Sequence, residues 1–181
     1  MTQSSKQFLE GLEQSANEVV RRTRELVGGL TPEELLRRPA PDRWSIADCY
    51  EHLIRSSEVY HPLIRRAVEE ASAAPPDQPF RKTWPARFFI SMADDRVRVK
   101  AKAPRAFVPP AQARPDAPER FYQIQQEYLE ILRAAAGKDL SSARVPSPAT
   151  RLLKLSLGAA LELLVRHQQR HVKQAEALRV D

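Results

Sequence analysis

Histidines are the residues of this chain whose type and spacing point most directly to chemistry. His167 and His171 lie four residues apart in a segment with the apolar periodicity of a helix. Because an α-helix turns by about 100° per residue, the two side chains are only about 40° apart around its axis. Two imidazoles so placed can bind one metal ion. On the apolar side of a helix, an ion would also satisfy ring nitrogens that are costly to bury alone.

A third ligand must come from another segment of the chain. The remaining two of the four histidines, His52 and His61, lie nine residues apart in one predicted helix. That separation places them on opposite sides of the helix, so at most one can join the site. The apolar periodicity slightly favours His61, but spacing alone leaves the choice open.

Four long helical segments are predicted to position these residues. Apolar residues recur at three- and four-residue intervals, and glycine, serine or proline punctuates the ends of the repeats. Ser45 is the predicted N-cap of the second segment, with Asp48 near the positive end of its dipole. The predicted helices span residues 8–27, 46–73, 119–136 and 155–178.

A long crossover separates the second and third helices. Nine prolines lie between residues 75 and 118, and one short helix is predicted over residues 86–94. Long connections of this kind are uncommon inside compact domains and are often functional. The segment contains aromatic and aliphatic residues, so we expect it to pack over the bundle. Only Arg96 to Lys102 shows an alternating, strand-like pattern.

Composition restricts the classes of function. The 181 residues suit one domain spanning residues 1–181. The net charge of +6 is scattered along the chain, which does not favour a specific nucleic-acid partner. No apolar run approaches a membrane span of about 20 residues, and the first residues lack the apolar core of a signal peptide. Cys49 is the single cysteine, so no internal disulfide forms and a cytoplasmic location is expected.

Three segments of the chain resemble the DinB-like superfamily. Residues 44–53, WSIADCYEHL, match its pattern of Trp-Ser/Thr, six residues, then His and an apolar residue. Residues 167–174, HQQRHVKQ, match the pattern His-x-x-Arg-His-x-x-Gln of its closing helix. Residues 103–109 are similar to its proline-bounded segment before the third helix. The three motifs occur in family order, and the resemblance extends over nearly the whole chain.

The resemblance implies an all-α fold, a DinB-like four-helix bundle with a long proline-rich crossover between helices 2 and 3. It also implies a three-histidine metal site, with His52, His167 and His171 as ligands. His61 matches no family ligand and is expected to be partly buried or at the surface. Three neutral imidazoles suit a divalent transition metal, with zinc or nickel preferred, and they leave a coordination position open.

Several functions follow from such a site. Some relatives are thiol S-transferases or isomerases, which implies a metal-activated low-molecular-weight thiol and a small-molecule substrate. A metal-dependent hydrolase is the alternative; it needs a general base, for which Asp48 is the first candidate although a capping role is also expected. A third reading is a non-enzymatic, metal-stabilised module for dimerisation or stress response. A homodimer is expected, with neither a membrane nor a specific nucleic acid as partner.

Other polar residues near the motifs have more ordinary interpretations. Glu51 and Glu58 are weaker candidates for a base and are expected to be solvated. Cys49 could serve as a fourth ligand, but a small buried core residue is the preferred reading. Arg170, between the two histidines of the last helix, is expected to face away from them and to have a structural role.

Overall fold

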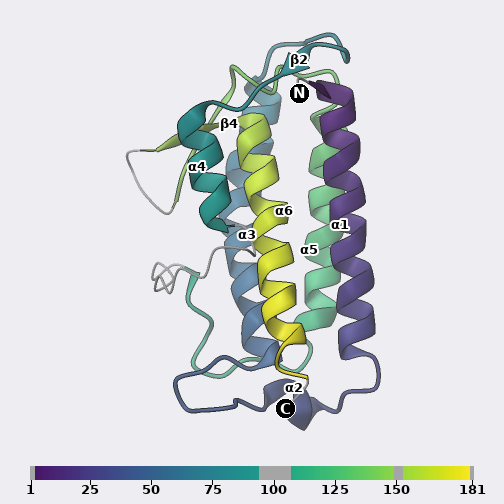
Figure 1. Ribbon diagram of the computed structural model, residues 1–181, viewed down its shortest axis with the longest axis vertical. Helices are drawn as coiled ribbons and strands as arrows, with labels where there is room; N and C mark the ends of the chain where they lie inside the picture. The colour runs from purple at the N-terminus through teal and green to yellow at the C-terminus, as the bar shows by residue number, and fades with distance from the viewer. Residues whose placement is uncertain (1–2, 94–106, 149–152, 180–181) are drawn as a thin grey trace.

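The computed structural model describes residues 3–93, 107–148 and 153–179 of the chain. Its four longest helices lie side by side along the long axis of the molecule (Figure 1). These helices are α1 (Ser5–Val27), α3 (Ile46–Glu70), α5 (Ala117–Ala134) and α6 (Leu157–Glu176). Helix α3 packs mainly against α5 and α6, and α1 packs against the same two helices. The all-α fold expected from the sequence is confirmed.

Local capping explains where the helices begin. Ser45 accepts a hydrogen bond from the backbone N–H of Asp48, and the Asp48 carboxylate accepts one from the backbone N–H of Ser45. Ser4 and Gln7 form the same reciprocal arrangement, so α1 begins three residues before the predicted start. Glycine marks a helix end: after the C-terminus of α5, Gly137 has a φ of 74°, a left-handed conformation that glycine adopts without strain.

Large aromatic and aliphatic side chains fill the centre of the bundle. Tyr50 of α3 and Phe121 of α5 are fully buried, with ring centroids 5.4 Å apart. Tyr128 of α5 is also fully buried, and its hydroxyl donates to the carbonyl of Leu161 in α6 at 2.8 Å. Fully burying a large apolar side chain contributes about 1.5–3 kcal/mol, so these contacts fix the relative positions of α3, α5 and α6.

The crossover supplies a short helix that covers part of α6. Helix α4 (Trp84–Ala93) begins two residues before its predicted start and packs against α6. Phe107, further along the crossover, is buried, as expected. The expectation of packing is wrong for Trp84 and Phe88, which are 77% and 59% exposed and stack on each other. Both lie on the side of α4 that no other described element covers.

Short strands were not predicted from the sequence. Strand β1 (Gln3–Ser4) pairs antiparallel with β2 (Pro79–Phe80), and β3 (Arg144–Pro146) pairs with β4 (Lys154–Ser156). Two or three residues are too few for an alternating pattern to be recognised. The predicted alternation at residues 96–102 lies outside the described residues. A short helix, α2 (Pro32–Leu36), lies between α1 and α3 in the chain.

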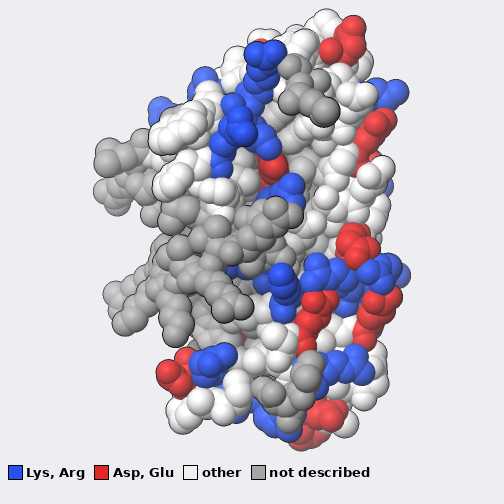
Figure 2. Space-filling view, viewed as in Figure 1, with Lys and Arg blue, Asp and Glu red and all other residues white. Residues whose placement is uncertain are grey.

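The surface carries both signs of charge. Basic and acidic side chains lie next to one another on the face shown in Figure 2, and Arg21 of α1 pairs with both Glu18 and Glu25. Such neighbours offset much of the formal charge locally. Among the described residues, no helix combines the length and apolar character required to cross a membrane.

Candidate metal centre

Three histidines from two helices meet inside the bundle. His52 extends from α3, and His167 and His171 extend from successive turns of α6. One potential ligand nitrogen from each ring lies within 4.8 Å of those of the other two rings. The Nε2 atoms of His52 and His167 are 3.0 Å apart. We refer to these three residues as the histidine triad.

Two of the three imidazoles are oriented by partners outside the triad. The Nδ1 atom of His52 lies 2.6 Å from the carbonyl oxygen of Phe107, and that of His171 lies 3.0 Å from Oε1 of Gln174. Both partners are oxygen acceptors, so both Nδ1 atoms carry the proton. The Nε2 atoms of His52 and His171 then carry the lone pair, and that of His52 accepts a hydrogen bond from Nε2 of His167. Hydrogen bonding of a distal ring nitrogen is typical of histidines that ligate metals.

The surroundings keep all three rings neutral. Burial lowers the pKa of His167 to about 3, with further contributions from His52 and from the positive charge of Arg170. Burial is also the main cause of the lowered pKa of His52 and of His171. Metal ions bind neutral imidazole, so at neutral pH all three rings have the charge that metal binding needs; ligation through Nε2 of His167 would require its proton to lie on Nδ1.

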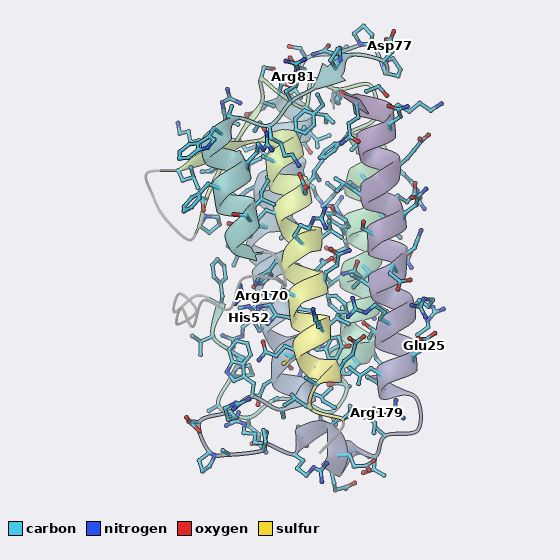
Figure 3. The ribbon with its side chains drawn as sticks, in the orientation of Figure 1. Glu25, His52, Asp77, Arg81, Arg170 and Arg179 are labelled. Atoms are coloured by element: carbon cyan, nitrogen blue, oxygen red, sulfur yellow. The ribbon has the colours of Figure 1, made fainter. Side chains whose placement is uncertain are left out.

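Trp44 and Arg170 complete the surroundings of the triad. The indole of Trp44 lies 4.9 Å from the His52 ring and 5.9 Å from the His171 ring, measured between centroids. Arg170 was expected to face away from the triad, and the positive charge of its guanidinium contributes to the lowered pKa of each triad histidine. Figure 3 shows Arg170 and His52 at the same height along the bundle.

Asp48, the candidate general base, is engaged elsewhere. It is fully buried, and both of its carboxylate oxygens accept hydrogen bonds from the guanidinium of Arg38, at 2.7 and 2.8 Å. The Oδ2 atom also accepts from the backbone N–H and the hydroxyl of Ser45. These contacts hold the pKa of Asp48 below its usual value, although burial acts in the opposite direction. They give Asp48 the role of a buried helix cap.

The remaining candidates from the sequence are separate from the triad. His61 is buried and its Nδ1 atom contacts Glu127 at 3.0 Å, so it belongs to the interface between α3 and α5. Cys49 is fully buried, and burial raises the pKa of its thiol, which disfavours the thiolate. Glu51 was expected to be solvated but is buried, and it pairs with Arg114 and Arg120.

Two participants in the site had no clear signal in the sequence. The carbonyl of Phe107 belongs to the backbone of the crossover, and no side-chain pattern can show which carbonyl reaches His52. Trp44 directly precedes Ser45, the N-cap of α3. Its place in the WS motif, eight residues before His52, was the available hint that it belongs to the site.

The fold and the site together define a class of protein: an all-α bundle that brings three histidines from two helices to one point, where they could hold a metal ion. A family model described as the DinB superfamily matches residues 16–175. The chain therefore belongs to the DinB superfamily, and the resemblance seen in its motifs is confirmed. Neither the curated proteins nor the solved structures contain a match to the chain.

Proposed function

We propose that the histidine triad binds one divalent transition metal ion, zinc or nickel, and that the loaded protein is an enzyme. The observation that carries the proposal is the convergence of three imidazole nitrogens within 4.8 Å, two of them oriented through Nδ1. Ligand nitrogens of a tetrahedral zinc site, with bonds of about 2.0–2.1 Å, lie about 3.4 Å apart. The 3.0 Å between the Nε2 atoms of His52 and His167 and the 4.8 Å limit for the whole triad lie on either side of that spacing.

Three protein ligands leave room for an exchangeable one. An ion bound in this way supplies Lewis acidity and lowers the pKa of a thiol or water that occupies the open position. The residues of this chain orient the ligands: Phe107 positions His52, and Gln174 positions His171. Trp44 provides an apolar wall beside the rings, which limits the access of bulk water.

Transfer of a low-molecular-weight thiol is the activity we favour. Hydrolysis needs a general base beside the attacking water, and Asp48 is bound by Arg38 and Ser45 through both carboxylate oxygens. Among the described residues, no carboxylate forms a hydrogen bond or ion pair with a triad histidine. A thiol attacks as the thiolate, so once deprotonated it needs no further base.

The test combines metal loading with a thiol-transfer assay. The purified protein is stripped with a chelator, reloaded with zinc or nickel, and incubated with cysteine or glutathione and 1-chloro-2,4-dinitrobenzene. The reaction forms the thioether and releases chloride and a proton. We expect loaded protein to accelerate product formation and His171→Ala to lose the acceleration. Stoichiometric metal binding without thiol transfer to any electrophile tested would support a non-enzymatic module instead.

A further inference from the structure

A cavity lined mainly by charged side chains lies on the face of α3 next to that of His52. Its volume is about 300 Å³, at the lower end of the range for small-molecule sites. We call it the arginine pocket; its lining residues are Glu51, Arg55, Glu58, Pro110, Gln112, Arg114 and Arg120. Helix α3, the crossover and α5 all contribute to it. Nothing in the proposed metal chemistry uses these side chains.

The α3 side of the pocket follows from helical spacing. Glu51, Arg55 and Glu58 lie four and three residues apart, so they form one stripe along the helix. His52 is about 100° away from Glu51 and faces the triad. The crossover separates the two sites: the carbonyl of Phe107 contacts His52, and the next carbonyl, that of Val108, accepts a hydrogen bond from Arg55 at 3.0 Å.

The arginines around the pocket retain hydrogen-bonding capacity. Arg120 donates from Nη1 to Oε1 of Glu51 at 3.0 Å, and Arg114 approaches the same oxygen at 3.4 Å. Arg55 donates to Val108 through one nitrogen. A guanidinium has five N–H donors and matches the geometry of a carboxylate, so donors of these residues are available to a ligand. The buried charge of Glu51 is already compensated by its two arginines.

Glu58 adds a charge of the opposite sign. It is exposed at the edge of the pocket, and no described residue forms a hydrogen bond or an ion pair with it. A ligand that carried only negative charge would be repelled by this carboxylate. A ligand that carried only positive charge would face three arginines against two carboxylates. A small molecule that carries both signs can pair with Glu58 and with the arginines at once.

We propose that the arginine pocket binds a small zwitterion that carries a carboxylate and an ammonium group, as an α-amino acid does. The ligand carboxylate contacts Arg55 and Arg120, and its ammonium group contacts Glu58. The inference depends on the pocket alone and holds whether or not the triad binds a metal.

An NMR titration with L-alanine tests the proposal. We expect saturable shifts of backbone amide signals from residues 51–58 and 111–114. N-acetyl-L-alanine lacks the ammonium group and L-alaninamide lacks the carboxylate, so both should bind at least about tenfold more weakly, the loss of roughly one charged contact. No saturable shift with L-alanine, or equal binding of acetate, would overturn the proposal.

Matched substitutions on one helix complete the experiment. Glu58→Gln removes the proposed ammonium contact at an exposed position and should weaken L-alanine binding at least about fivefold. Glu69→Gln, also at an exposed position of α3 but outside the pocket, should leave binding unchanged. Arg55→Gln should weaken the binding of L-alanine, and the variant should retain the amide spectrum of a folded protein. Equal affinity of the wild type and Glu58→Gln would contradict the assigned ligand.

Discussion

The Nδ1 atom of His52 lies 2.6 Å from the carbonyl oxygen of Phe107, a residue 55 positions away in the crossover. A carbonyl oxygen only accepts, so this contact fixes the His52 tautomer and directs the Nε2 lone pair toward His167 and His171. The crossover therefore orients the His52 ring, which α3 alone would leave free to rotate.

The first prediction concerns which histidines bind the metal. His167→Ala and His171→Ala should abolish stoichiometric zinc or nickel binding, because two imidazoles remain and the ligand set falls below three. His61→Ala should retain full metal content, since His61 contacts Glu127 on the α5 side of α3. Elemental analysis of the purified variants measures this directly. Unchanged metal content in His171→Ala would refute the assignment of the triad.

The second prediction concerns Gln174, which orients His171. Gln174→Leu removes the acceptor 3.0 Å from Nδ1, so the ring loses its fixed orientation and metal affinity should fall by about 10- to 100-fold. Competition with a chromogenic chelator measures the affinity. Gln169→Leu, also in α6 and outside the contacts of the triad rings, is the control. Equal affinities of the two variants would exclude a role for Gln174.

Most of the helical architecture of the bundle was predicted from the sequence. The boundaries of the long helices fell within three residues of those observed, because apolar periodicity and capping residues act locally. The proximity of His167 and His171 in α6 was predicted from helical geometry. The choice between His52 and His61 could not be predicted in this way. Apolar periodicity slightly favoured His61, which is indeed buried, but on the side of α3 that faces α5 and not on the side of the triad. A family motif, not spacing, indicated His52.

Tertiary contacts account for what the sequence did not predict. The buried pair of Glu51 with Arg120 joins residues 69 positions apart, and the sequence around Glu51 gives no sign that this glutamate is buried. The role of Gly158 in helix packing was not predicted from the sequence either. A Cβ at that position would lie 2.4 Å from the Phe80 ring, so the β2 segment can pack on α6 only where a glycine is present.

The third prediction uses Trp44 as an intrinsic reporter of the triad. Its ring lies 4.9 Å from His52, so binding of nickel should quench its fluorescence. The chain has two tryptophans, and Trp84 is exposed on α4. In Trp84→Phe, saturable quenching by nickel should track metal stoichiometry. In Trp44→Phe, which retains only Trp84, nickel should cause little change; equal quenching in both variants would contradict the geometry.

The fourth prediction assigns Asp48 a stabilising role. Asp48→Asn weakens the contact with Arg38 and the cap at Ser45, so the free energy of unfolding should fall by about 1–3 kcal/mol. The pKa of Asp48 is lowered in the folded state. Its contribution is therefore complete above the unfolded pKa of about 3.9 and is lost as pH falls through the folded value. Urea denaturation should show that the free energy of unfolding falls more between pH 7 and pH 3 for the wild type than for Asp48→Asn.

The fifth prediction concerns the pH dependence of stability in the metal-free protein. His52, His167 and His171 all have lowered pKa values when folded, that of His167 reaching about 3. Below the unfolded value of about 6.5, the unfolded chain binds protons that the folded triad does not. Stability is therefore complete above that pH and declines below it, by at most about 1.4 kcal/mol per pH unit for each histidine.

Urea denaturation between pH 7 and pH 5 isolates this effect, because ordinary carboxylates begin to titrate only below that range. The midpoint for metal-free wild type should fall steadily with pH. His167→Ala removes one of the buried rings, so its midpoint should depend less on pH, while His61 and the other two histidines still contribute. Saturating zinc should raise every wild-type midpoint, because it binds only the folded chain. A midpoint that stayed constant between pH 7 and pH 5 would mean that the triad takes up protons in the folded state, and that its rings are not held neutral for an ion.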